Sequence, residues 1–209
     1  MIIVNLKTYK TLKEDLKLAK KIEKASKNIM IAVQPTDIYL IAKKIKNPIL
    51  AQHIDPIKPG RNTGEISAKS IKSVGAVGTL LNHSEHMLKF ADIKKSVAMC
   101  KKLRLKTIVF AKNIKEGKKI SRLKPSYIAI EPPELVAGKK SVSKAKPALI
   151  KNAVKGIKGH VLVGAGIKTL EDVKKAKELG AKGILASSGV VKSKNTTKLL
   201  KSWIMEYEN

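Results

Sequence analysis

This chain of 209 residues contains little of what several common protein classes require. It has one cysteine, Cys100, so it cannot form a disulfide within itself. Cys100 lies in the helix-like pattern SVAMCKKL, which favours a buried, reduced thiol over a metal ligand. No hydrophobic run is long enough to span a bilayer, and MIIVNLKTYK lacks the features of a signal peptide. We therefore expect a cytoplasmic protein with no membrane partner.

Aromatic residues are also scarce, at 3% of the chain, and arginine occurs only at Arg61, Arg104 and Arg122. Proteins that read bases or stack on them draw mainly on these residue types. The net charge of +28 still invites a nucleic-acid interpretation. However, the lysines recur as pairs in separate segments and collect in no single stripe, so we interpret them as solvated helix faces. The sequence predicts salt-sensitive adsorption to polyanions and no specific nucleic-acid partner.

Apolar runs rich in β-branched residues recur at a steady interval along the chain. There are eight, at residues 2–4, 29–33, 49–51, 77–81, 107–110, 127–130, 160–163 and 183–186. Amphipathic, lysine-rich stretches with helical spacing separate most of them, such as 12–25, 92–103 and 169–180, the last ended by Gly180. Hydrophobic residues make up 43% of the sequence, which is enough for a sizeable core, and no linker marks a second domain.

Strands that alternate with helices in this way predict a parallel sheet closed on itself as a (β/α)8 barrel, with residues 1–209 forming a single domain. An open doubly wound sheet is the alternative, because the number of strands does not prove closure. The longest connection rich in Pro and Gly, 54–67, follows the third strand. Loops of that length are typically functional or docked against another surface.

Polar residues follow several strands at the edge where a barrel of this type holds its active site. Asn5 and Lys7 come after the first strand, two residues apart and therefore on the same face of an extended chain. His83 and Glu85 follow the fourth strand. Glu131 ends the sixth, and the two prolines after it stiffen the backbone. Together these side chains supply a base, an imidazole and a cation at one rim.

Small residues follow the last two strands. Gly164-Ala165-Gly166 comes after 160–163, and Ser187-Ser188-Gly189 comes after 183–186. Small residues that open a helix expose backbone N–H groups, which suits a phosphate. Taken singly, each of these features has an ordinary structural explanation, but their joint occurrence at one rim favours a functional site.

Six blocks of this sequence resemble the ordered motifs of the triosephosphate isomerase family in its shorter archaeal form. They are NLK (5–7), NTGEIS (62–67), NHSEHM (82–87), EPPELV (131–136), VGAGI (163–167) and LASSGVV (185–191). The resemblance runs over nearly the whole chain. It implies an isomerase of glycolysis and gluconeogenesis that interconverts dihydroxyacetone phosphate and D-glyceraldehyde 3-phosphate through an enediolate, with no metal and no organic cofactor.

The resemblance also implies roles for individual residues. Glu131 is the expected base, His83 the electrophile and Lys7 the substrate-binding cation, with Glu85 in support. We further expect that His83 precedes a helix start, where the helix dipole disfavours the imidazolium form. The substrate-binding residues implied are Asn5, Lys7, Ala137, Gly166, Ser187 and Ser188, and residues 132–139 are the expected lid.

Some positions depart from the family pattern. The far end of the lid commonly reads Gly-Thr-Gly, whereas this chain has Ala137-Gly138-Lys139. His53 stands where many relatives carry Asn, and we interpret it as structural. Thr63, on the long third loop, matches a residue that docks into a neighbouring subunit in relatives. We therefore expect a homo-oligomer, either a tetramer or a dimer.

Two alternatives to the isomerase remain at this stage. A different phosphate-handling barrel would keep the turns after strands seven and eight but should lack the HSE and EPP blocks. The function of a non-catalytic basic scaffold would not depend on Glu131 or His83.

Overall fold

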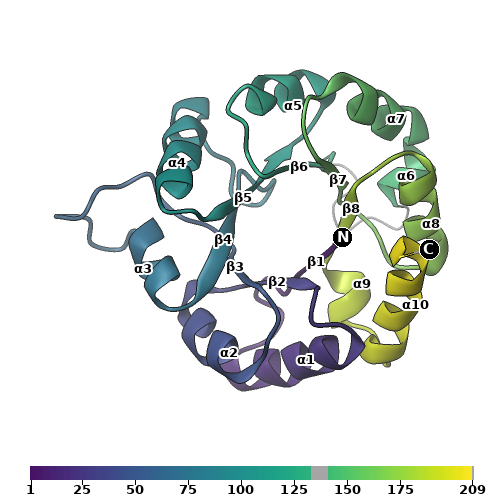
Figure 1. Ribbon diagram of the computed structural model, residues 1–209, viewed down its shortest axis with the longest axis horizontal. Coiled ribbons are helices and arrows are strands. Elements are labelled where there is room, and N and C mark those ends of the chain that lie inside the picture. Colours follow the sequence, from purple (N-terminus) through teal and green to yellow (C-terminus); the bar gives the residue numbers. More distant parts are fainter. Residues whose placement is uncertain (133–140, 209) are drawn as a thin grey trace.

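The computed structural model describes residues 1–132 and 141–208 of the chain (Figure 1). Its strands coincide with the apolar runs of the sequence, because β-branched side chains pack well on a pleated surface that is buried on both faces. They are β1 (Ile2–Asn5), β2 (Met30–Val33), β3 (Ile49–Ala51), β4 (Ala76–Leu81), β5 (Lys106–Ala111), β6 (Tyr127–Ile130), β7 (Val161–Val163) and β8 (Gly183–Ala186).

The sheet is a closed barrel in which the strands follow one another in sequence order. Closure comes from the parallel pairing of β1 with β8, in which Ile3 lies opposite Leu185. This pairing confirms the predicted (β/α)8 barrel and excludes the open doubly wound sheet. Figure 1 shows the strands as a ring with the helices outside it.

Helices follow the strands, and the longer ones are amphipathic with their apolar side chains turned toward the barrel. They are α1 (Leu12–Ala25), α2 (Ile38–Lys44), α3 (Ala68–Ser73), α4 (Phe90–Lys102), α5 (Ile114–Ser121), α6 (Val142–Ala145), α7 (Pro147–Gly156), α8 (Leu170–Glu178), α9 (Ser188–Val191) and α10 (Thr196–Glu208), with a 3-10 turn, η1, at Pro35–Asp37. The predicted end of α8 is confirmed, since Gly180 follows it with φ +87°.

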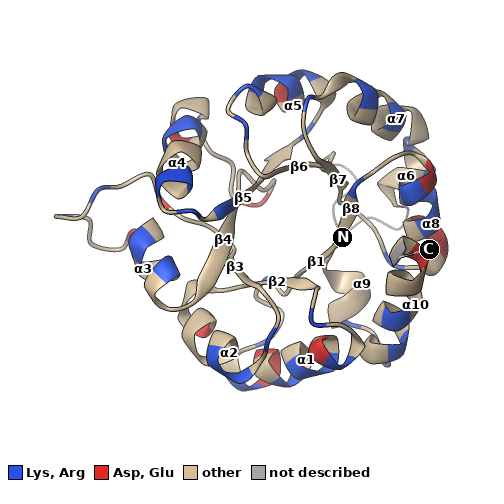
Figure 2. Cartoon of the chain, in the orientation of Figure 1, with Lys and Arg blue, Asp and Glu red and all other residues tan. Residues whose placement is uncertain are grey.

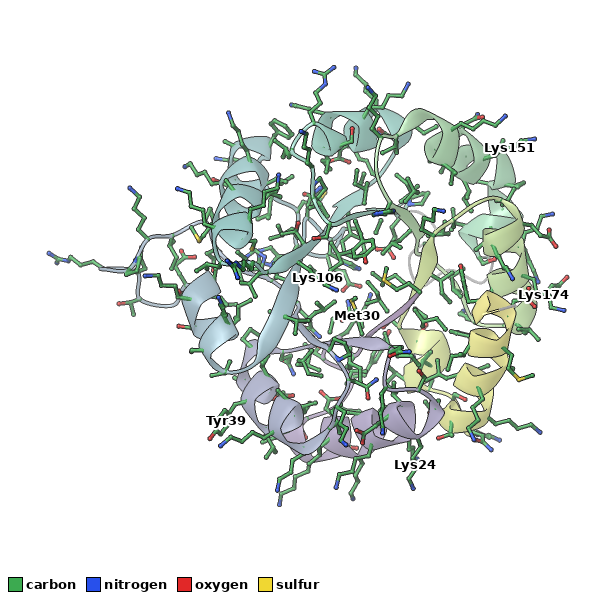
Figure 3. All side chains as sticks on the ribbon, in the orientation of Figure 1. Lys24, Met30, Tyr39, Lys106, Lys151 and Lys174 are labelled. Atoms are coloured by element: carbon green, nitrogen blue, oxygen red, sulfur yellow. The ribbon has the colours of Figure 1, made fainter. Side chains whose placement is uncertain are left out.

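The core has two layers. Side chains such as Ile3, Leu50 and Phe110 fill the inside of the barrel, and a larger set lies between the strands and the helices. In Figure 3, Met30 lies among the side chains inside the ring, whereas Lys24 and Lys174 lie at the outer surface. The interior of the barrel is therefore filled by side chains and leaves no channel through the ring of strands.

The basic residues are distributed over the outer helices rather than gathered on one face (Figure 2). α1 shows the pattern, since it buries Leu18 and Ile22 on one side while Lys17 and Lys24 stay accessible on the other. The distribution matches the expected solvated helix faces. No helix in the described part of the chain is long and apolar enough to cross a membrane.

One expectation about local structure is wrong. The residues after His83 do not start a helix, because α4 begins only at Phe90. They form a tight turn in which the His86 N–H donates to the His83 carbonyl. Asn82 closes this segment with φ +59° and a side chain that accepts from the Leu88 N–H. A helix dipole therefore does not act on His83 here.

The connection after β3 protrudes from the barrel between α3 and α4, at the left edge of Figure 1. Residues 58–61 and Thr63 are exposed on it, in keeping with the long loop expected from the sequence. Its base is held by Asp55, which accepts hydrogen bonds from the Ile66 N–H at 2.7 Å and pairs with His53 at 2.9 Å.

Candidate active site

A pocket opens at the carboxyl ends of the strands, where the sequence analysis places the site. Its lining combines the side chains that follow β1, β4, β6, β7 and β8. The lining residues are Lys7, Tyr9, His83, Glu131, Ala165, Gly166, Ile167, Leu185, Ala186, Ser187 and Ser188. The fold thus brings together a carboxylate, an imidazole, an ammonium and three hydroxyls that are up to 181 residues apart in the sequence.

Glu131 is buried at the end of β6, where its own N–H still donates to Ala111 of β5. One carboxylate oxygen, Oε1, accepts a hydrogen bond of 3.0 Å from the backbone N–H of Ala165. The other oxygen, Oε2, has no aligned donor in the described residues. The carboxylate is therefore held by one oxygen while the other is left available to take a proton.

Gly164 is required beside this carboxylate. A Cβ atom at that position would lie 2.5 Å from Glu131 Oε1, which is closer than real Cβ contacts. The Gly164 N–H also donates to Ile130, the last residue of β6. The glycine thus lets the turn after β7 approach the base closely enough for Ala165 to hold it.

The protonation state of His83 follows from its hydrogen bonds. Its Nδ1 accepts from the backbone N–H of Glu85 at 3.1 Å. A ring nitrogen that accepts a hydrogen bond carries no proton, which assigns a neutral imidazole with the proton on Nε2. Nε2 lies 3.0 Å from Glu131 Oε2, but the alignment is not that of a hydrogen bond. The Nε2–H group therefore lies next to the base, and it can donate to a third group that lies beside both side chains.

Lys7 has an unusual backbone, with φ +51° in the left-handed region. Its N–H donates to Asn5 Oδ1 at 3.0 Å, and its carbonyl accepts from Gln52 Nε2 at the same distance. Its ammonium pairs with Glu85 Oε1 at 2.5 Å. A strained residue held by several partners is typical of a functional position, and here the strain directs the cation toward the pocket.

The part of the pocket formed by the turn after β7 and the start of α9 suits an anion. Gly166, with φ +73°, lies in the turn after β7, and Ser187 and Ser188 open α9 after β8. The first N–H groups of a helix have no partner within it. The Ser187 hydroxyl is buried and has no hydrogen-bond partner among the described residues. A phosphate oxygen would supply the missing acceptor.

The structure places most of the predicted residues where the sequence indicated. Lys7, His83, Glu131, Gly166, Ser187 and Ser188 line one pocket. Asn5 and Glu85 are outside this lining and contact Lys7: Asn5 accepts a hydrogen bond from its N–H, and Glu85 forms the ion pair with its ammonium. Ala137 and the rest of the Ala137-Gly138-Lys139 segment lie outside the described residues, as does most of the expected lid at 132–139.

Sequence reasoning missed two contributors. Gln52, the first residue after β3, donates to both Asn5 Oδ1 and the Lys7 carbonyl. It occupies a strand end like the other candidates, so the same criterion would have found it. The Ala165 N–H that holds Glu131 is a main-chain group, and no side-chain pattern indicates it.

Comparison with known proteins agrees with this geometry. Residues 1–203 match the family model for triosephosphate isomerase. The triosephosphate isomerase of Methanocaldococcus jannaschii is 43% identical over 98% of this chain and 98% of its own length. That of Methanothermus fervidus is 42% identical over 99% of this chain and 98% of its own.

A solved structure extends the likeness to the fold. Triosephosphate isomerase from Bartonella henselae superposes with a TM-score of 0.75 over 100% of this chain and 98% of its own, at 19% identity. At that identity the match shows the barrel alone. The family model and the curated relatives carry the assignment further: the chain belongs to the triosephosphate isomerase family, whose members interconvert dihydroxyacetone phosphate and D-glyceraldehyde 3-phosphate.

Proposed function

We propose that Glu131, His83 and Lys7 perform the triose-phosphate interconversion in the pocket at the carboxyl end of the barrel. The observation that supports this most directly is the pair of free groups that face each other. Glu131 Oε2 has no aligned donor among residues 1–132 and 141–208, and His83 Nε2, which carries its proton, lies 3.0 Å from it. Removing a proton from a carbon next to a carbonyl group requires a base at the carbon and a hydrogen-bond donor at the carbonyl oxygen, and these two groups must lie side by side.

The reaction begins with proton removal. Glu131 Oε2 takes a proton from C1 of dihydroxyacetone phosphate, and the C–H electron pair moves to form the C1–C2 double bond as the carbonyl electrons move to O2. His83 donates from Nε2 to O2, which spreads the developing charge. The product of this step is an enediol(ate) held between the two side chains.

The reverse transfer completes the isomerisation. His83 takes the O1 proton back at Nε2, and Glu131 returns its proton to C2, which yields D-glyceraldehyde 3-phosphate. One carboxylate therefore serves both carbons. Lys7 stabilises the negative charge on the substrate, and Glu85 holds the ammonium in place through their ion pair.

The phosphate group of the substrate would bind where the turn after β7 and the start of α9 line the pocket. Gly166 and the start of α9 offer backbone N–H groups, and the Ser187 hydroxyl has no protein partner among the described residues. Ser188 lies next to it in the same lining. This arrangement holds the phosphate at one end of the pocket and the reacting carbons at the other.

A coupled assay for triose-phosphate interconversion tests these roles. We expect Glu131→Ala to lower kcat by at least about a hundredfold, since the base contributes on the order of 10²–10⁴ in such reactions. His83→Gln should keep a hydrogen-bond donor but lose the proton relay, which changes the pattern of solvent tritium exchange during turnover. A kcat that survives Glu131→Ala would remove Glu131 as the base.

We further propose that the protein acts as a homo-oligomer, a tetramer or a dimer, that associates through the loop after β3. The exposure of Thr63 on a loop that protrudes from the barrel supports this (Figure 1). Light scattering should give a multiple of 22.8 kDa, and Thr63→Arg should lower it. A wild-type mass of 22.8 kDa would refute the proposal.

A further inference from the structure

A buried carboxylate outside the pocket connects the parts of the phosphate wall. Asp172, at the third position of α8, is 4% exposed. Its Oδ2 accepts hydrogen bonds from the backbone N–H groups of Lys168 at 3.0 Å and Thr169 at 2.9 Å. Its Oδ1 accepts from the Ser141 hydroxyl at 2.7 Å. Three donors from two separate segments thus converge on one side chain.

Only part of this arrangement is explained by helix capping. The Thr169 side chain accepts from the Asp172 N–H while Asp172 accepts from the Thr169 N–H, which forms a capping box at the start of α8. A capping box uses one carboxylate oxygen. The second oxygen reaches Ser141 at the start of α6, and the Ser143 hydroxyl donates to the Asp172 carbonyl at 3.1 Å.

The contacts of α6 extend the connection to the base. The Val142 N–H donates to the Ala165 carbonyl at 3.1 Å, and the Ala165 N–H donates to Glu131 Oε1. The segment 164–168 is therefore held at two points. Asp172 binds it at Lys168, and α6 binds it at Ala165. Asp172 also holds α6, through the hydroxyl of Ser141. The same segment contributes Gly166 and Ile167 to the pocket lining.

We propose that Asp172 is a positioning residue that fixes the turn 164–168 and the segment 141–145 relative to each other, and so sets the phosphate wall of the pocket. This proposal rests on the phosphate site proposed above. Asp172 touches no reacting atom, and it acts through the backbone N–H of Lys168 and the hydroxyl of Ser141.

The charge state of Asp172 agrees with this role. Burial would raise its pKa, but the hydrogen bonds from Ser141, Lys168 and Thr169 outweigh burial and hold the pKa of Asp172 below its ordinary value. The side chain is therefore ionised over the whole range in which the enzyme would be assayed. Both carboxylate oxygens of Asp172 accept hydrogen bonds from backbone N–H groups or from a hydroxyl. The ammonium of Lys144 lies 3.5 Å from Oδ1.

Asp172→Asn tests the proposal with almost no change in volume. The amide is uncharged and accepts at one oxygen only, so the charge-assisted hydrogen bonds to the two segments are lost, and the Ser141 hydroxyl can keep a contact with Asn only by reversing its direction to accept from the amide NH2. A lost hydrogen bond to a charged group corresponds to on the order of tenfold to a hundredfold in binding. We expect the KM for D-glyceraldehyde 3-phosphate, and the inhibition constant of inorganic phosphate, to rise by about tenfold or more, with a smaller fall in kcat.

Glu171→Gln is the matched control. It removes the same charge from the neighbouring position and breaks the ion pair with Lys144, but its side chain is 77% exposed. We expect both constants to stay within about twofold of wild type, as is usual for an exposed ion pair. An equal rise in the two variants would overturn the proposal, because it would trace the effect to net charge.

Three further results are decisive. If Asp172→Asn lowers the melting temperature but leaves KM and the phosphate inhibition constant unchanged, Asp172 is a helix cap only and the proposal fails. If Asp172→Asn does not fold, Ser141→Ala decides, since it leaves the capping box intact. We expect a rise in both constants of about threefold or more for Ser141→Ala, and unchanged constants would overturn the proposal. If inorganic phosphate does not compete with substrate in the wild-type protein, the proposed phosphate site is wrong, which is a separate failure.

Discussion

Two aspartates near the starts of helices, Asp172 in α8 and Asp15 in α1, are both buried, at 4% and 0% exposure. Asp172 receives donors at both oxygens. Neither oxygen of Asp15 has a hydrogen-bond donor among the described residues. Burial, followed by the charge of Asp37, raises the pKa of Asp15 to about 7, whereas the hydrogen bonds to Asp172 lower its pKa.

The difference shows that burial alone does not fix the charge of a carboxyl group. The surface at the carboxyl ends of the strands is rich in turns, and turns supply backbone N–H groups that stabilise an anion. The region between α1 and η1 offers Asp15 a second carboxyl group, Asp37, in place of a donor. Asp15 therefore holds its proton at a higher pH than an exposed aspartate does.

Glu131 is intermediate between Asp172 and Asp15 in the number of its carboxylate oxygens that accept a hydrogen bond. Its substitution should have the largest effect on activity. One of its oxygens has a donor, and the other has none within the part of the chain that the structure describes. Glu131→Asp withdraws the carboxylate by one methylene, and a misplacement of about 1 Å can cost on the order of a hundredfold in rate. We expect steady-state kinetics to show a fall in kcat far larger than the rise in KM. Equal changes in the two would count against a role confined to proton transfer.

Gly164→Ala disturbs the contact between Glu131 and its donor, the Ala165 N–H, while the Glu131 residue itself is unchanged. The added Cβ would lie 2.5 Å from Oε1, so either the carboxylate or the turn must move. We expect kcat to fall by on the order of tenfold or more, because the base loses its fixed position. The same coupled assay measures this, and a variant with wild-type kcat would show that the Ala165 N–H does not hold Glu131 during turnover.

Asp15→Asn should change how stability depends on pH. The folded pKa of Asp15, about 7, lies above its unfolded value of 3.8. The folded chain therefore binds this proton more tightly, so the contribution is full below pH 3.8 and is lost as the pH rises toward 7. Asparagine cannot ionise. We expect the variant to gain at least about 1 kcal/mol in unfolding free energy over wild type at pH 8.

Urea unfolding of both proteins at several pH values measures this gain. The difference between them should grow from pH 4 to pH 7 and then level off. Lys10 and Glu14 also act on Asp15, with opposite signs, and both are unchanged in the variant. A difference that is constant with pH would mean that Asp15 is ionised in the folded protein, and the contrast with Asp172 would be lost.

The smallest expected effect concerns the surface charge. The substrate is a dianion, and the outer helices carry lysines on every side of the barrel (Figure 2). Salt shortens the Debye length from about 30 Å at 0.01 M to about 10 Å at 0.1 M, which weakens attraction from a distance. We expect kcat/KM to fall a few-fold over this range while kcat changes little. A kcat/KM that does not respond to salt would show that the lysines play no part in capture.

The sequence predicted the strands because an apolar, β-branched run has few alternatives to a buried strand. It did not predict how β1 meets β8, because register between distant segments leaves no local pattern. Glu131, His83 and Lys7 were predictable because strand ends collect at one rim. The helix expected after His83 was wrong because Asn82 uses its side chain to close a turn, which the helix-like composition of HSE does not reveal.

The His83–Glu85 contact has a consequence for how this site tolerates mutation. The group that keeps a proton off Nδ1 is a main-chain N–H. Nineteen of the twenty amino acids would supply the same donor at position 85, and only proline would not. The backbone conformation at residues 83–85 therefore determines which nitrogen of His83 carries the proton. A substitution of the Glu85 side chain can remove the ion pair with Lys7 and still leave the tautomer of His83 unchanged.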